Sequence, residues 1–229
     1  MSIPFYVSPD QMMRDRADFA RKGIARGRSV IAAHCADGIV LVAENPSGSL
    51  HKISEIYDRI GFAAVGRYNE FEALRVQGIR YADLRGYAYD RADVSGRGLA
   101  NSYAQLLGTS FSSGTEKPFE VQLCVAELGG DPEQDRLFVI NFDGSISQAG
   151  DFAVMGGHTD PVIGAMRDRH DANGSLAGAL RAAVAALRTG GAVNAGELEV
   201  ALLDRSRLGR RTFVRLDGRR IAGLMGDEA

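Results

Sequence analysis

Residues 28–66 constrain the fold more than any other stretch of this chain, because they read as four short apolar strands in close succession. The expected strands are residues 29–34, 39–44, 50–57 and 60–65. Asp37-Gly38 joins the first two strands, and a glycine there tolerates the positive φ that a tight hairpin turn requires. Turn-forming residues at 45–48 separate the two pairs. Both pairs are apolar enough that we expect most of their surface to be buried.

The rest of the chain alternates between helical and strand patterns. Apolar residues recur at three-to-four spacing in 68–85 and 94–107, which predicts two helices. Further patterns predict strands at 119–125, 137–140, around 146 and at 152–155, helices at 159–170 and 175–187, and closing strands at 197–203 and 212–216. This order is typical of an α+β fold built as a four-layer αββα sandwich, in which each sheet is covered by helices on one face and by the other sheet on its second face.

Ahead of the first strand, Ser8-Pro9-Asp10-Gln11 carries the signals of a helix start: a cap, a proline at the first helical position, an early carboxylate and a capping-box glutamine. The helix is expected to run to about Lys22 and to stop at Gly23. Its apolar side is expected at three residues, Met12, Met13 and Phe19. From the residues alone, we expect such a helix to cover the domain's own core.

Composition limits the classes of function. The chain has 229 residues, of which 45% are hydrophobic, which suits one large domain or two small ones. Its formal net charge of −2 argues against nucleic acid as the main partner. We expect a short tail at 1–7, one domain at 8–226 and a short tail at 227–229. No signal peptide or membrane span is recognisable, so we expect a cytoplasmic protein that binds no membrane. Cys35 and Cys124 lie in apolar strand patterns, which favours two buried thiols over a disulfide.

Three segments in and around the first predicted sheet resemble one known family. They are residues 40–44 (Val-Leu-Val-Ala-Glu), 52–58 (Lys-Ile-x-x-Ile-Tyr-Asp) and 62–66 (Phe-Ala-Ala-Val-Gly), and they look like the first sheet of proteasome subunits. The resemblance implies the fold of the N-terminal-nucleophile hydrolases, with an extra N-terminal helix, and it spans Ser8 to about Leu216.

In the catalytic β subunits of that family, a threonine freed by processing opens the first strand, an acid closes the second and a lysine precedes the third. By this resemblance Glu44 is the acid, Lys52 is the lysine, and Arg28 occupies the nucleophile position. A guanidinium cannot attack a carbonyl, and a long leader precedes it, so no α-amine is free to act as the base. The chain therefore resembles the non-catalytic α subunit of actinobacterial proteasomes, with no catalytic residues. The alternative is a self-processing amidase or peptidase that uses Ser29 after cleavage at Arg28.

As an α subunit, the chain would form heptameric outer rings, gate substrate entry and dock the β subunits, in which the threonine protease activity resides. The resemblance implies that the N-terminal helix crosses the top of the sheet and packs between neighbouring subunits of the ring. It would also bind a ring-shaped ATPase through that protein's C-terminal tails. The substrates in transit would be proteins tagged with a ubiquitin-like modifier. No cofactor is implied.

The resemblance also assigns site residues. Lys52 would line a pocket between neighbouring subunits and pair with the terminal carboxylate of the ATPase, with Gly27 as the small residue that admits the tail. From the residues alone, the favoured interpretation of Lys52 is a surface lysine in a strand. Glu44 is expected to be a structural partner of Lys52 or Arg28. The axial gate would be formed by the tail and the start of the helix: Ile3, Phe5, Tyr6, Val7, Ser8, Pro9 and Asp10.

Two other stretches are open to more than one interpretation. Residues 85–91 mix aromatics with arginines, which suits either a protein interface or a solvated loop. Gly-Gly-His-Thr at 156–159 is expected to be a strand-to-helix turn, the alternative being an anion site at the start of a helix. The spacing of the four histidines does not suggest a metal site.

Overall fold

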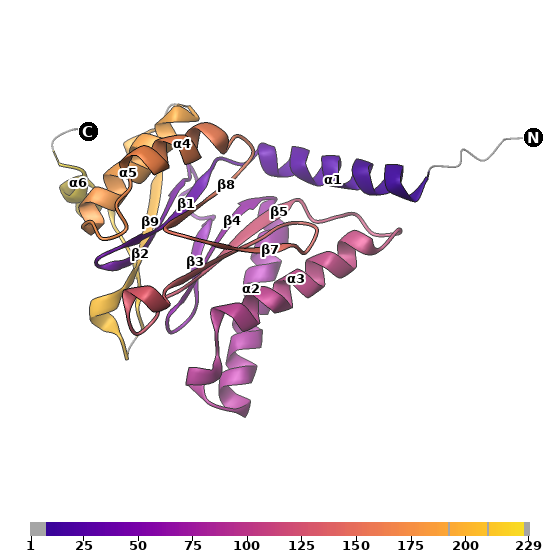
Figure 1. Cartoon of the computed structure of the whole chain (residues 1–229), viewed down its shortest axis with the longest axis horizontal. Helices are drawn as coiled ribbons and strands as arrows, with labels where there is room; N and C mark the ends of the chain where they lie inside the picture. The colour runs from indigo at the N-terminus through magenta and orange to yellow at the C-terminus, as the bar shows by residue number, and fades with distance from the viewer. Residues whose placement is uncertain (1–7, 192, 210, 227–229) are drawn as a thin grey trace, which may run out of the picture.

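The computed structural model describes residues 8–191, 193–209 and 211–226 and contains two five-stranded antiparallel sheets with helices outside them (Figure 1). The first sheet has the order β10-β9-β2-β1-β8 and the second β3-β4-β5-β6-β7. The strands are β1 (Val30–Cys35), β2 (Gly38–Glu44), β3 (Ile53–Tyr57), β4 (Ile60–Gly66), β5 (Val121–Glu127), β6 (Arg136–Ile140), β7 (Ile146–Ala149), β8 (Phe152–Met155), β9 (Leu198–Asp204) and β10 (Phe213–Arg215). The α-helices are α1 (Pro9–Ala25), α2 (Tyr68–Ala88), α3 (Gly96–Ser112), α4 (Asp160–Arg169), α5 (Leu176–Thr189) and α6 (Gly218–Met225).

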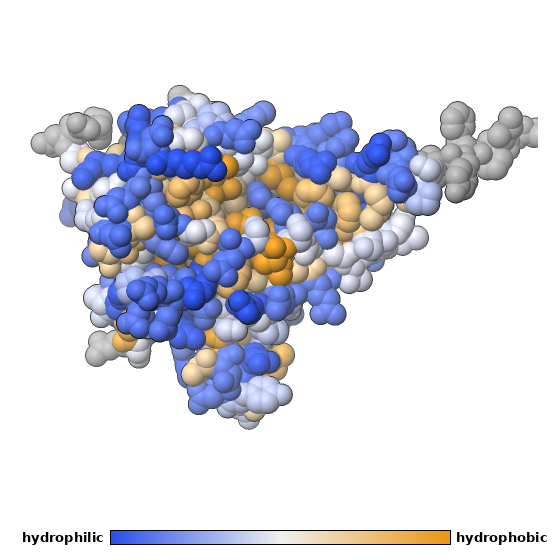
Figure 2. Space-filling view, in the orientation of Figure 1, coloured by the Kyte–Doolittle hydropathy of each residue, from blue (hydrophilic) through white to orange (hydrophobic). Residues whose placement is uncertain are grey.

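Three apolar layers hold the sandwich together, and they confirm the four-layer αββα fold. One layer packs α4, α5 and α6 on the outer face of the first sheet, and a second packs α2 and α3 on the outer face of the second sheet. The third layer lies between the two sheets. In Figure 1, α4 and α5 lie above the sheets and α2 and α3 below them, and the surface over α4 and α5 is largely hydrophilic (Figure 2).

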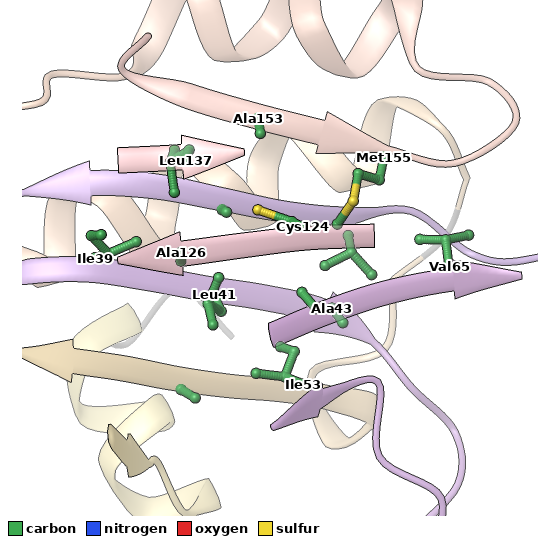
Figure 3. Packing of buried hydrophobic residues seen from close by; sticks show 14 of the residues in the cluster. Ile39, Leu41, Ala43, Ile53, Val65, Cys124, Ala126, Leu137, Ala153 and Met155 are labelled. Carbon is green, nitrogen blue, oxygen red and sulfur yellow. The ribbon is translucent and has the colours of Figure 1, made fainter. Parts of the chain in front are cut away.

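The central layer is built mainly from small and branched side chains of both sheets (Figure 3). Every residue of β2 is buried, because one face of this strand meets the second sheet and the other meets α5. The β1–β2 turn forms as expected, since Cys35 pairs with Gly38 and Gly38 has a φ of 136°. Cys35 and Cys124 are free and buried, which confirms two buried thiols, and burial raises the pKa of Cys35 to about 11.

The four strands of residues 28–66 are divided between the two sheets, and the expectation that they form one first sheet is wrong. β1 pairs with β2 in the first sheet, and β3 pairs with β4 in the second. The expectation that both hairpins are mostly buried is also wrong for β3, because this strand lies at a sheet edge and buries only Ile53 and Ile56. β8 follows the strands of the second sheet along the chain but pairs with β1 in the first sheet. No local pattern reports which strands far apart in sequence will pair.

The start of α1 is confirmed, and its end is not. Ser8 caps the helix by accepting a hydrogen bond from the backbone N–H of Gln11 at 3.2 Å. The Gln11 side chain donates to Asp15 at 2.8 Å, so it does not complete the expected capping box. The helix continues through Gly23 to Ala25. A Cβ on Gly23 would lie 2.6 Å from the Cβ of Glu120, so this glycine permits close packing on the residue that precedes β5 and does not stop the helix.

The expected apolar side of α1 is not the side that packs on the domain. Ala20 and Ile24 are buried in the central layer, whereas Met12, Met13 and Phe19 are 39%, 38% and 46% exposed. The periodicity therefore indicates two apolar faces, one that covers the chain's own core and one that remains exposed in the single chain.

The remaining elements match the predicted order within a few residues, with one omission. α6 was not expected from the sequence, and it packs on α5 with Ile221 buried. Ser175 caps α5 by accepting from the N–H of Gly178 at 3.2 Å. In the part of the chain that the structure describes, no helix combines the length and apolarity needed to cross a membrane.

Candidate functional site

Arg28 lies between α1 and β1, at the position where the resemblance puts a nucleophile. Its guanidinium forms an ion pair with the carboxylate of Glu44 at the end of β2 and lies 3.4 Å from that of Glu197. The predicted partnership of Glu44 with Arg28 is therefore observed. These contacts hold a permanent cation at the start of the strand, where an attacking group would need a free proton-accepting amine.

Lys52 is the centre of the same site. Its Nζ donates hydrogen bonds to two backbone carbonyls, Arg28 at 3.0 Å and Glu44 at 2.9 Å. Burial lowers the pKa of Lys52 to about 8, with Arg28 acting in the same direction and Glu199 opposing it. An ammonium carries three N–H donors, so one remains beyond these two carbonyls. Lys52 is thus a partly buried cation with a donor available for an anion, and not an ordinary surface lysine.

Glu199 positions Lys52, and reasoning from the sequence did not identify it. This buried carboxylate on β9 accepts from the backbone N–H of Lys52 at 2.9 Å and of Ile53 at 3.2 Å. It also accepts from the Asn45 side chain at 2.7 Å and forms an ion pair with Arg215 at 2.5 Å. The single carboxylate therefore fixes the entry to β3 against the first sheet. The available signal was an acidic residue inside an otherwise apolar strand, Leu-Glu-Val-Ala-Leu-Leu.

Gly27 lies at the edge of a separate hollow of about 390 Å³ between the end of α1 and the β4–α2 connection. The lining residues are Phe19, Lys22, Gly23, Arg26, Gly27, Gly66, Arg67 and Glu120. A Cβ on Gly27 would lie 2.7 Å from Cγ1 of Val65, so close packing of α1 on β4 already requires a glycine. Lys52 is not among the lining residues. The structure connects the two predicted pocket residues only through Arg28, whose carbonyl binds Lys52 and which directly follows Gly27.

The predicted gate residues fall into two groups. Ile3, Phe5, Tyr6 and Val7 lie outside the described residues. Ser8, Pro9 and Asp10 form the capped start of α1, all of them exposed.

Ser29, the nucleophile of the alternative reading, immediately precedes β1 and is covered on one side by the β8–α4 turn. A Cβ on Gly156 would lie 2.8 Å from its Oγ. The Lys52 ammonium is bonded to the carbonyls on Arg28 and Glu44, and no hydrogen bond to the Ser29 hydroxyl is found within the described part of the chain.

Residues 156–159 do form the expected turn between β8 and α4. Gly156 has a φ of 138°, and its N–H donates to the Gln122 side chain at 3.2 Å. A Cβ on Gly157 would lie 2.3 Å from Cα of Ala25, so the glycine pair allows α1 to pass close to the turn. At 85–91 the helix α2 extends to Ala88, and Tyr87 is 93% exposed.

Comparison with known proteins identifies relatives along the whole chain. A family model described as "Proteasome subunit" matches residues 24–203. The chain is 58% identical over 231 residues to a protein named "Proteasome subunit alpha" from Nocardioides sp., covering 99% of this chain and 91% of that relative. It is 56% identical to the protein of that name from Streptomyces griseus, covering 100% and 87%, and 55% identical to the one from Kineococcus radiotolerans, covering 98% of each.

Proposed function

The chain belongs to the proteasome subunit family as an α subunit of the actinobacterial type, and from that premise we propose that it is a non-catalytic subunit that forms rings, gates the core particle and docks an activator. The observation that carries the proposal is Arg28 at the nucleophile position, paired with Glu44 and followed by a partly buried Lys52. We assign residues 1–7 to a tail, 8–226 to the domain and 227–229 to a second short tail. We also propose that the protein acts in the cytoplasm.

An α subunit assembles with other proteasome subunits, and we assign this chain to a heptameric ring stacked on β subunits that carry the threonine protease activity. The exposed apolar residues of α1 support a subunit contact. Met12, Met13 and Phe19 face away from the core of the single chain, and a neighbouring copy that covers them removes apolar surface from water.

The gate is assigned to the tail that precedes α1 together with the start of the helix. Ile3, Phe5, Tyr6 and Val7 would pack against their copies across a closed pore. Ser8, Pro9 and Asp10 support this role because a capped helix start provides a fixed point from which the tail departs.

The docking site for an activating ATPase is assigned to Lys52 and Gly27. The remaining N–H donor on Lys52 suits a terminal carboxylate, because a charge-assisted hydrogen bond is stronger in a partly desolvated site than in open water. The hollow beside Gly27 offers room for the residues that precede such a carboxylate. The proteins delivered by the ATPase would be those tagged with a ubiquitin-like modifier.

Substitution of Lys52 tests the docking assignment. In core particles assembled with β subunits, we expect Lys52→Ala to leave cleavage of short peptides unchanged and to remove ATPase-dependent degradation of a folded, tagged protein. Arg219→Ala provides the control, since it removes an exposed cation from α6, away from Lys52. If Lys52→Ala particles degrade the tagged protein at the wild-type rate, the docking assignment is wrong.

A further inference from the structure

A second cationic hollow, of about 310 Å³, lies among α4, α5 and α6, on the outer side of the first sheet. Three arginines line it: Arg169 ends α4, and Arg181 and Arg188 lie on α5. All three are exposed, and the surface over α4 and α5 is strongly hydrophilic (Figure 2). We call this hollow the arginine groove.

The charge of the arginine groove is not balanced locally. No carboxylate is among its lining residues, and within residues 8–191, 193–209 and 211–226 none of the three arginines takes part in an ion pair. Arg181 does have a structural contact, because its Nη1 donates to the carbonyl of Leu224 at 3.0 Å and ties α6 to α5. Ten other described arginines form an ion pair with a carboxylate, whereas these three lie together around one hollow without one.

Helix dipoles account for only part of this arrangement. Arg169 and Arg188 lie in the last turns of α4 and α5, where a cation is favourable. Arg181 lies in the middle of α5 and gains nothing from that effect. The floor between the arginines contains Gly178, Ala182 and Ala185, whose small side chains let a bound backbone approach the helix.

We propose that the arginine groove binds an acidic segment of a partner protein, with its carboxylates paired to Arg169 and Arg188. A guanidinium presents paired donors that match a carboxylate. Nucleic acid fits less well, because the chain carries a net charge of −2 and no aromatic residue lines the groove for a base to stack on. The arginine groove is distinct from the Lys52 site, because Lys52 lies at the entry to β3 and is not among the residues that line the groove.

A fluorescent octaglutamate peptide is the probe for this proposal, with binding measured by anisotropy at low salt on the full chain co-assembled with β subunits. Arg169→Glu and Arg188→Glu are each expected to weaken binding by roughly tenfold, since each replaces an attraction by a repulsion. The matched control is Arg219→Glu, an exposed arginine on α6 outside the groove lining, which should change the affinity by less than about twofold. Arg188→Lys keeps the charge and should retain binding, which separates loss of charge from loss of fold.

Three results would overturn the proposal. The first is equal affinity of wild type and Arg188→Glu for octaglutamate, and the second is a single-stranded octanucleotide that binds more tightly than the peptide. The third is loss of octaglutamate binding in Lys52→Ala with retention in Arg188→Glu, which would place the peptide at the docking site. If Lys52→Ala still binds octaglutamate, the arginine groove is supported, whether or not this variant loses ATPase-dependent degradation. The docking proposal for Lys52 and the proposal for the arginine groove are therefore tested independently.

Discussion

Lys52 combines two properties that rarely occur together in one side chain: it is largely removed from water, and it has to carry charge to serve the proposed role. Its two carbonyl partners favour the ammonium form, yet burial and the nearby Arg28 lower its pKa to about 8. The charge of this site therefore changes close to physiological pH, unlike that of an exposed lysine.

We predict that docking of the ATPase tail weakens as pH rises through about 8, because deprotonation of Lys52 removes the cation that the carboxylate needs. The measurement is the affinity of a peptide with the ATPase's C-terminal sequence for the core particle between pH 7 and 9. Lys52→Arg is the control, since a guanidinium stays charged over this range and any remaining affinity should not depend on pH. A wild-type affinity that is constant from pH 7 to 9 would contradict the assignment.

A second prediction at the residue scale concerns Glu199. Glu199→Gln removes the charge that faces Arg215 and one of the two acceptor oxygens used by the backbone of Lys52 and Ile53. We expect a loss of about 1–3 kcal/mol in the free energy of unfolding, because a backbone N–H at the entry to β3 loses its acceptor and the exposed Arg215 loses its ion pair. Chemical denaturation measures it. Glu197→Gln is the matched control, as Glu197 only meets Arg28 near the surface, and a loss of similar size there would refute the special role of Glu199.

Some residues of the site could be predicted from the sequence, and others could not. Glu44 and Lys52 could be assigned because they stand beside the Asp-Gly turn and the Lys-Ile-x-x-Ile-Tyr-Asp segment in a recognisable family pattern. Glu199 lies 147 residues after Lys52 along the chain, so no local spacing connects the two. The role of Glu199 can be recognised only from the pairing of β9 with β2.

Among the elements, α1 illustrates how local signals define one end of a helix better than the other. A capping serine followed by proline depends on neighbouring residues alone, and it placed the start of the helix correctly. A glycine near the end has two meanings, a stop or a close contact. At Gly23 the close approach of Glu120, the residue before β5, decides for the second meaning, and Glu120 is far from Gly23 in the sequence.

The exposed face of α1 yields a prediction about assembly. Met13→Asp should leave the unfolding free energy of the single chain within about 1 kcal/mol of wild type, because Met13 is exposed and belongs to none of the chain's buried clusters. The same substitution should prevent ring formation, since it places a carboxylate in the proposed apolar contact. Size-exclusion chromatography with light scattering measures assembly. Arg14→Asp, at the next and already polar position, is the control, and rings that form equally well from Met13→Asp would count against a subunit contact on this face.

At the scale of the whole molecule, the sandwich brings the site together from both sheets. Arg28 precedes β1 and Glu44 is the last residue of β2, and both strands belong to the first sheet. Lys52 directly precedes β3 of the second sheet, and Glu199 lies on β9 of the first sheet. The sequence was sufficient to predict the layers, because each layer needs only an element order and an apolar face. It was not sufficient to divide the strands correctly between the sheets, because pairing of β1 with β8 and of β2 with β9 is decided by packing over long sequence separations.

The central claim is that this chain is a ring-forming subunit in which Arg28 has replaced the attacking group. Native mass spectrometry of the chain co-expressed with its β subunit tests this most directly, because it reports both copy number and the mass of the mature chain. We predict heptameric α rings whose chains retain the residues before Arg28. A species that begins at Ser29 and does not assemble into rings would contradict the claim.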